Sequence, residues 1–174
     1  RTSLPGLETT SGPLGEGLSQ AIGIALAAKM DKKNYKVYCL TSDGEHEEGN
    51  TWEAAMFAAK NKLNNLIQVI DRNYIQIDGN TEDIMPLEDL KAKYESFNWN
   101  TIEIDGNDIK SFVEAVEKAK MVMDKPTIII AKTIPGKGVS FMENDYHWHG
   151  KPPNKEEAQK ALGELKTIEE NLNA

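Results

Sequence analysis

The sequence predicts a parallel α/β fold, that is, a parallel β-sheet with helices on both faces. Four short runs rich in β-branched and apolar residues recur along the chain with helical patterns between them, and this alternation is typical of a parallel sheet. The runs are 37–40, 66–70, 101–104 and 127–131. Two of them, 66–70 and 127–131, are almost continuously apolar, as expected for strands that helices cover on both faces.

Apolar residues at helical spacing predict the segments between the strands. The predicted helices are 17–29, 50–63, 111–123 and 154–172. The expected buried faces are Trp52, Met56, Ala59 and Leu63 in the second helix, and Phe112, Val116, Ala119 and Met123 in the third. Asn154 and Glu157 are spaced as a capping pair for the C-terminal helix. The segments 78–86 and 135–153 are predicted to be loops, and the second carries His147, Trp148 and His149.

Composition places the chain among globular proteins. Its 174 residues, 39% of them hydrophobic, predict a single domain over residues 1–174. A net charge of −8 excludes a nucleic-acid surface, because phosphates need cationic partners. No apolar stretch reaches the length of a membrane span. Cys39 is the only cysteine, which predicts a reducing, cytoplasmic setting. The first residue is Arg1 rather than Met, so we expect the domain to be incomplete at its N-terminus.

Two polar side chains follow neighbouring predicted strands. Asp43 stands in Ser42-Asp43-Gly44-Glu45, and Asn73 ends Asp71-Arg72-Asn73. The carboxyl ends of parallel strands meet at one edge, where open α/β sheets bind ligands, so the two side chains could hold a hard metal ion. Taken singly, each is also a common turn residue. An acidic run beside Asp43, formed by Glu45, Glu47 and Glu48, concentrates like charge that a cation or a paired subunit would compensate.

Other clusters are less specific. The run from His46 to Asn50 lacks the second histidine of a zinc helix. The loop 12–17 is either a backbone-lined ligand loop or an ordinary helix entry. His147 and His149 have no further ligand residues nearby in the sequence, so a histidine near an anionic ligand is favoured over zinc.

In combination, these segments resemble the transketolase family, in particular its thiamine-diphosphate-binding (pyrophosphate) domain, over nearly the whole chain. The matching segments are Glu8-Thr9-Thr10-Ser11-Gly12-Pro13-Leu14-Gly15-Glu16-Gly17, Ser42-Asp43-Gly44-Glu45, Glu48-Gly49, Asp71-Arg72-Asn73, Ile77-Asp78-Gly79, Lys132-Thr133-Ile134-Pro135-Gly136 and His149-Gly150. The sequence departs from the family at Ser42, where glycine is common, and the family's upstream segment with its histidines is absent.

The resemblance implies a metal site that binds the cofactor. Asp43 and Asn73 would be side-chain ligands of Mg²⁺ or Ca²⁺, with the backbone carbonyl of Ile75 beside them, and the cation would bridge to the diphosphate. The backbone amide of Gly44 would contact that diphosphate. An acidic protein binds a diphosphate only with such a cation and with oriented amides.

The resemblance also implies roles outside the metal site. Gly12 and Leu14 would contact the aminopyrimidine ring through the main chain, and 135–153 would be an active-site loop. His149 would lie near the diphosphate and the reacting oxygens of the substrate. Glu48 would be a buried acid that pairs across a subunit interface and relays protons between two cofactors.

The implied activity is transfer of a two-carbon ketol unit between sugar phosphates, as in the pentose phosphate pathway. The missing second domain suggests a split transketolase, whose C-terminal pyrimidine-binding half is a separate subunit. The cofactor domain would also associate with itself, giving a heterotetramer, and this chain alone would be inactive. Three alternatives stay open: a fragment of a single-chain transketolase, part of an enzyme like 1-deoxyxylulose-5-phosphate synthase, and a non-catalytic binding or assembly fragment.

Overall fold

Four parallel strands form the central sheet of the computed structural model, which describes residues 4–9 and 12–172. Thr10 and Ser11, part of one matching segment, lie outside the described residues. The strand order is β1 (Val37–Ser42), β2 (Leu66–Arg72), β6 (Thr127–Lys132) and β5 (Asn100–Asp105). The predicted parallel α/β fold is confirmed, and each predicted strand lies within an observed one.

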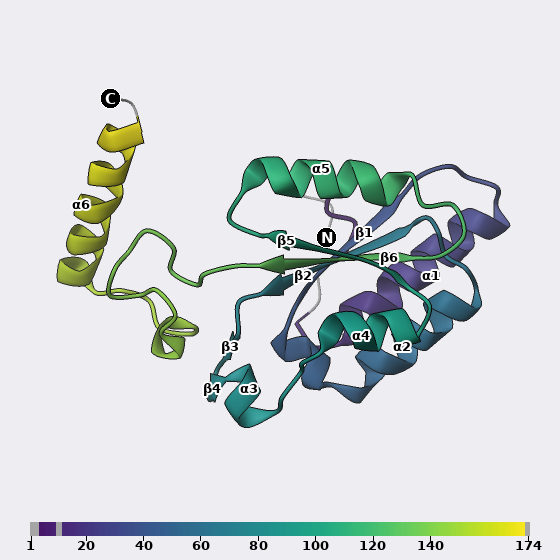
Figure 1. The fold of residues 1–174 in the computed structure, drawn as a ribbon, viewed down its shortest axis with the longest axis horizontal. Helices are drawn as coiled ribbons and strands as arrows, with labels where there is room; N and C mark the ends of the chain where they lie inside the picture. The colour runs from purple at the N-terminus through teal and green to yellow at the C-terminus, as the bar shows by residue number, and fades with distance from the viewer. Residues whose placement is uncertain (1–3, 10–11, 173–174) are drawn as a thin grey trace.

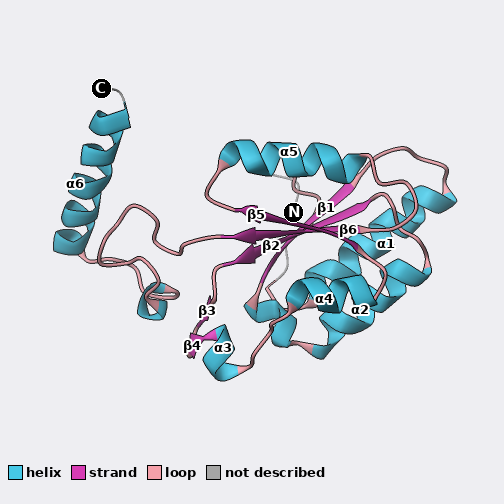
Figure 2. Cartoon of the chain, viewed as in Figure 1, coloured by secondary structure: helices cyan, strands magenta, loops and turns pink. Residues whose placement is uncertain are grey.

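Helices cover both faces of the sheet (Figure 1, Figure 2). The helices on one face are α1 (Glu16–Met30), α2 (Gly49–Lys60) and α4 (Leu90–Ser96), and α5 (Ile109–Lys120) lies on the other. A hydrophobic core lies on each face of the sheet, and the residues of the central strands pack into both. In β2, Leu66 and Ile70 pack toward α1 and α2, whereas Ile67 and Val69 pack toward α5. This double burial explains why the central strands are apolar throughout.

The edge strand β1 is covered on one face only. Val37 and Cys39 are buried, but Tyr38 and Leu40, whose side chains point to the opposite face, are 50% and 77% exposed. The strand therefore alternates between buried and exposed residues, the pattern of a half-covered strand.

The buried face predicted for α2 is wrong at Met56, whereas Trp52 and Ala59 pack against the core as expected. Met56 is 50% exposed, and the residues that face the core are Thr51, Ala54, Ala55 and Ala58. Small residues occupy this face because α2 packs against α1, whose buried side includes several alanines. Leu63 is fully buried, but it follows the end of the helix. In α5 the predicted face holds at Phe112, Val116 and Ala119, which all pack in the core beneath this helix. Met123 lies beyond the helix and is 74% exposed.

The predicted loop 78–86 contains regular structure. A short antiparallel hairpin joins β3 (Ile75–Gln76) to β4 (Gly79–Asn80), and α3 (Thr81–Ile84) follows directly. The helix α4 was not predicted at all. Its buried residues are only Leu90 and Tyr94, too few to give a helical period in the sequence.

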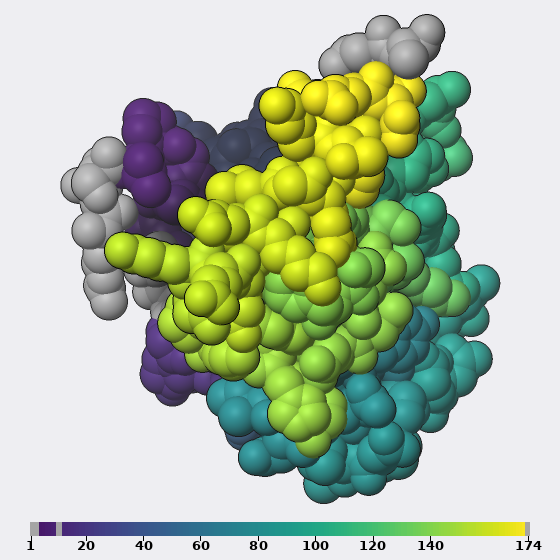
Figure 3. Space-filling model, turned by 90° about the vertical axis from the view of Figure 1, so that its left-hand side faces the viewer, coloured from purple at the N-terminus to yellow at the C-terminus, as the bar shows by residue number. Residues whose placement is uncertain are grey.

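The chain after β6 extends away from the sheet (Figure 1). It contains a short 3₁₀ helix, η2 (Tyr146–Trp148), and the helix α6 (Lys155–Leu172), which together spread over the face seen in Figure 3. The predicted capping pair forms: the Asn154 amide donates to Glu157 at 2.8 Å, and the Glu157 amide donates to Asn154 Oδ1 at 2.9 Å. Among the described residues, no helix has both the length and the apolar content to cross a membrane.

Candidate functional site

The two predicted ligand residues leave the sheet at the same edge. Ser42 pairs with Asp71 at the ends of β1 and β2, and the Asp43 amide donates to the Asp71 carbonyl at 3.2 Å. The opposite edge begins with Asn65, whose carbonyl accepts from the Val37 amide. Asp43 and Asn73 therefore follow neighbouring strands at the same edge of the sheet, and Asn65 lies at the other end of β2.

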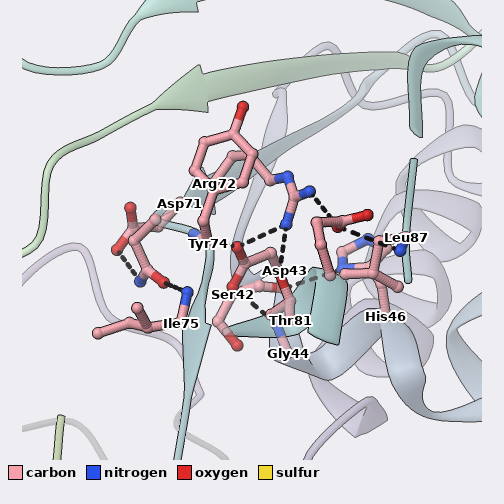
Figure 4. Close-up of polar contacts among 12 residues, drawn as sticks. Ser42, Asp43, Gly44, His46, Asp71, Arg72, Tyr74, Ile75, Thr81 and Leu87 are labelled. Carbon is pink, nitrogen blue, oxygen red and sulfur yellow. Dashed lines mark hydrogen bonds and ion pairs between the residues drawn. The ribbon is translucent and has the colours of Figure 1, made fainter. Parts of the chain in front are cut away.

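The Asp43 side chain has no exposed surface and accepts three hydrogen bonds (Figure 4). Its Oδ2 accepts from Arg72 Nη1 at 3.0 Å and from the Tyr74 amide at 2.7 Å, and its Oδ1 accepts from the Gly44 amide at 2.8 Å. Gly44 opens the 3₁₀ helix η1 (Gly44–Glu47). Burial raises the pKa of Asp43, and the Tyr74 amide and the Arg72 guanidinium act in the opposite direction by stabilising the carboxylate.

Asn73 is held by neighbours in the chain. Its Nδ2 donates to Asp71 Oδ2 at 3.2 Å, and its Oδ1 accepts from the Ile75 amide at 3.0 Å. The Thr133 hydroxyl of the segment after β6 donates to the other oxygen of Asp71. Because Asp71 can only accept, it fixes which end of the Asn73 carboxamide carries the oxygen.

The hairpin leaves the Ile75 carbonyl facing away from β4. The Thr81 amide donates to the Tyr74 carbonyl, and Ile75 is paired with Asn80. Hydrogen-bonded and non-hydrogen-bonded pairs alternate in an antiparallel ladder, so the Ile75–Asn80 pair is of the second kind. The Ile75 amide and carbonyl therefore face away from β4, and that amide is the one that reaches Asn73 Oδ1.

These atoms fit a hard divalent cation. Asp43 Oδ1, Asn73 Oδ1 and the Ile75 carbonyl are all oxygens, and each side-chain oxygen uses one lone pair for a single amide. Consecutive amides, those of Tyr74 and Ile75, anchor Asp43 and Asn73 respectively. Within 4–9 and 12–172, no group of three or more His, Cys, Asp or Glu residues could hold a metal.

A cavity of about 510 Å³ opens beside Asn73. Asn73, Ile75 and His149 all line it, as do Asp71 and Trp148. The structure thus brings together three of the predicted site residues: Asn73 directly after β2, Ile75 in the hairpin and His149 in the segment after β6. The other predicted residues do not line this cavity: Gly12, Leu14, Asp43, Gly44 and Glu48.

The loop before α1 packs on the acidic run. Gly15 has a φ of +78°, and a Cβ there would lie 2.1 Å from Asn50 Oδ1, so the position requires glycine. The Gly15 amide donates to Glu45 at 3.0 Å, and the Ser42 amide donates to the same carboxylate at 2.8 Å. Backbone amides therefore offset part of the negative charge for which the sequence suggested a cation or a subunit.

Glu48 is exposed in this chain, at the start of α2. The burial that the resemblance implies for Glu48 would have to come from a second subunit. Leu14 is 54% exposed and Gly12 is also exposed, so the main chain of this loop is open to a ligand or a partner.

Arg72 is the functional-site residue that sequence reasoning missed. It is buried at the end of β2, and its guanidinium pairs with Asp43, Glu82 and Glu88. The signal in the sequence was a charged residue at the end of an apolar strand. Its partner Asp43 is 29 residues earlier, and only the folded sheet brings the two together.

His46 is also buried, and it belongs to the core rather than to a metal site. Its ring contacts the Tyr94 hydroxyl at 2.8 Å and the Ser42 carbonyl at 2.9 Å. Burial lowers the pKa of His46 to about 4, so this ring is neutral near pH 7. The sequence lacks the second histidine of a zinc helix, and in the structure the His46 ring nitrogens contact Tyr94 and Ser42.

Comparisons with known proteins agree on one family. The family model described as "Transketolase, thiamine diphosphate binding domain" matches residues 1–167. The chain is 41% identical over 169 residues to one subunit of the apulose-4-phosphate transketolase of Phocaeicola vulgatus, covering 97% of this chain and 60% of that protein. It is 44% identical over 160 residues to the 6-deoxy-6-sulfo-D-fructose transketolase subunit SqwG of a Clostridium species, covering 92% of this chain and 58% of that protein.

A solved structure gives the same result. The transketolase of Campylobacter jejuni superposes with a TM-score of 0.84 at 36% identity, over 91% of this chain and 26% of that one. The chain thus spans about 60% of the length of the relatives that are named as transketolase subunits, and about a quarter of the length of that transketolase.

Proposed function

This chain belongs to the transketolase family, as its thiamine diphosphate binding domain, and on that premise we propose that it is the cofactor-binding half of a split transketolase. The reaction is transfer of a two-carbon ketol unit between sugar phosphates. Two relatives are named as subunits of transketolases with different substrates, which supports the reaction type and leaves the particular sugars open. A cytoplasmic location fits the single, buried Cys39.

The metal assignment rests on one observation, the pair of consecutive amides that anchor Asp43 and Asn73. In this proposal Asp43, Asn73 and the Ile75 carbonyl hold Mg²⁺ or Ca²⁺. The Gly44 amide, which donates to Asp43 Oδ1 in this structure, turns to the diphosphate when the cofactor binds. Bound thiamine diphosphate supplies the electron sink for carbanion chemistry. The residues of this chain bind and orient it, and the cation offsets the repulsion between a diphosphate and a chain of net charge −8.

The remaining site residues act on the ring and the substrate. The exposed main chain at Gly12 and Leu14 receives the aminopyrimidine, and His149 in the 135–153 loop donates to substrate oxygens at the cavity. Glu48 is exposed and meets a second copy of the domain, through which the chain self-associates. The pyrimidine-binding subunit completes the site, giving a heterotetramer.

The experiment uses the full native polypeptide, alone and with its pyrimidine-binding subunit. We expect a saturable change in tryptophan fluorescence on addition of thiamine diphosphate with Mg²⁺, and ketol transfer only when both subunits are present. Asp43→Asn should abolish both signals, whereas Glu114→Gln, which changes an exposed carboxylate on α5, should alter neither. If cofactor binds but no ketol donor is turned over by the pair, the chain is a non-catalytic binding module. If nothing binds, the cofactor assignment is wrong.

A further inference from the structure

Arg72 lies buried beside the proposed cation site, where it pairs with the buried Asp43 (Figure 4). Its other ion-pair partners, Glu82 and Glu88, have side chains that are 35% and 50% exposed. The Arg72 cluster consists of Arg72, Asp43, Thr81, Glu82 and Glu88. The side chain of Arg72 is 1% exposed, although an arginine is almost never fully buried unless it is paired. A buried ion pair adds little stability compared with apolar packing, so its presence here calls for a reason other than stability.

We propose that Arg72 is a positioning residue that holds Asp43 so that one carboxylate oxygen is left for the cation. Each carboxylate oxygen can accept about two hydrogen bonds. Asp43 Oδ2 accepts two, from Arg72 Nη1 and from the Tyr74 amide, and is saturated. Oδ1 accepts from the Gly44 amide alone, which leaves it one lone pair. This inference rests on the proposed function, since it concerns the same cation.

The other members of the cluster hold Arg72 in turn. Its Nη1 also donates to the Thr81 hydroxyl at 2.8 Å, and its Nη2 donates to Glu82 at 2.5 Å and to Glu88 at 2.8 Å. The guanidinium carbon lies 4.0 Å from the centre of the Tyr74 ring. These contacts come from the segment after the β3–β4 hairpin, so the segment 81–88 fixes Arg72, and Arg72 fixes Asp43.

The charges of the cluster favour a cation. A single arginine next to Asp43 would neutralise the ligand and weaken its attraction for a metal. Glu82 and Glu88 share the same guanidinium, so one positive charge faces three carboxylates and a net charge of −2 is left. Arg72 can therefore orient Asp43 without cancelling its charge.

The test measures metal affinity apart from catalysis. In the full native polypeptide with its pyrimidine-binding subunit, Mn²⁺ binding in the presence of thiamine diphosphate is followed by electron paramagnetic resonance. Arg72→Lys keeps the charge but replaces the fork of donors by one ammonium. We expect its Mn²⁺ dissociation constant to rise about 10-fold, as for partners that orient metal ligands.

Thr81→Val is the milder second variant. It keeps every charge and nearly the same volume, and it removes only the hydroxyl that accepts from Arg72 Nη1. We expect the Mn²⁺ dissociation constant to rise about three-fold. This is less than the rise of about 10-fold to 100-fold that is usual when a residue in direct contact with a metal ligand is changed. This variant keeps the proposal testable if Arg72→Lys does not fold.

The control is Tyr94→Phe, which removes a buried hydroxyl that donates to Gln68 at 3.1 Å and contacts the His46 ring at 2.8 Å. Neither bond involves the Asp43 carboxylate, whose donors are Arg72, Tyr74 and Gly44. It should lower the melting temperature and leave Mn²⁺ affinity unchanged. If Arg72→Lys and Thr81→Val also lower the melting temperature without changing Mn²⁺ affinity, Arg72 is only structural and the proposal is overturned. Absence of Mn²⁺ binding in the wild type would instead refute the proposed function, and the inference with it.

Discussion

Asp43 and Asn73 end neighbouring strands of one sheet, yet they are held in different ways. The Asp43 carboxylate is fully buried, and two of its donors, Arg72 and Tyr74, lie 29 and 31 residues further along the chain. Asn73 is half-buried at a cavity, and its partners Asp71 and Ile75 are two residues away on either side. One ligand residue depends on tertiary structure and the other on a local turn.

The difference follows from charge. A neutral carboxamide needs only two neighbouring polar groups, which a turn supplies. A buried carboxylate costs several kcal/mol unless a cation and hydrogen bonds compensate it, and no local turn offers a guanidinium. We therefore expect changes at Asp43 to affect both folding and metal binding, and changes at Asn73 to affect metal binding almost alone.

The largest expected effect is that of Asp43→Ala. Loss of a charged ligand should raise the Mg²⁺ dissociation constant at least about 100-fold. The free energy of unfolding should fall by about 2 kcal/mol. A buried guanidinium that loses its only partner costs more, but Arg72 in this variant still pairs with Glu82 and Glu88. Calorimetric titration and urea denaturation measure the two quantities. Glu114→Ala removes an exposed carboxylate from α5 and should change neither.

Asn73→Ala should separate the two effects. Loss of a neutral ligand should raise the Mg²⁺ dissociation constant by about 10-fold to 100-fold. The free energy of unfolding should change by less than about 1 kcal/mol, the usual worth of a partly exposed hydrogen bond. The same titration and denaturation apply. A loss of stability as large as that of Asp43→Ala would show that the contrast between the two residues is wrong.

Thr133→Val tests the local support of Asn73. The valine lacks the hydroxyl that donates to Asp71, so Asp71 and the Asn73 carboxamide gain freedom. We expect a rise of about three-fold in the Mg²⁺ dissociation constant, the smallest of these metal effects. Thr101→Val is the matched control, because the Thr101 hydroxyl also donates to a carboxylate, that of Glu95, on an exposed surface. Equal Mg²⁺ affinities for the two variants would show that Thr133 does not support Asn73.

Cys39 reports whether β1, the strand that leads to Asp43, stays folded in these variants. Its thiol is 7% exposed, and burial raises the pKa of Cys39 to about 12. Thiolate is the reactive form, so at pH 8 the folded chain should react with a thiol reagent only through unfolding. We expect rates close to wild type for Asn73→Ala and faster reaction for Asp43→Ala. Rapid reaction of the native wild-type chain would contradict the burial of this strand.

The sequence predicted local features and missed those that depend on packing. Apolar runs located all four main strands, and the spacing of Asn154 and Glu157 predicted the cap of α6. Both patterns involve residues that are close together in the sequence. The prediction for α2 was wrong at Met56 and missed the fully buried alanines, because close contact with α1 selects small residues that carry little periodic signal. The helix α4 was missed because it turns only two side chains into the core.

The sequence alone determined that Asp43 and Asn73 lie at one edge of a parallel sheet, since strand ends and polar residues can both be located by pattern. The motifs around them identified the family that the comparisons confirm. Only the tertiary structure decided how Asp43 is held. Arg72 reaches Asp43 because β1 and β2 pair in register, and Glu82 and Glu88 reach Arg72 because the hairpin turns the chain back. The interaction between two charges depends on their distance in space, and a local sequence pattern contains no information on that distance.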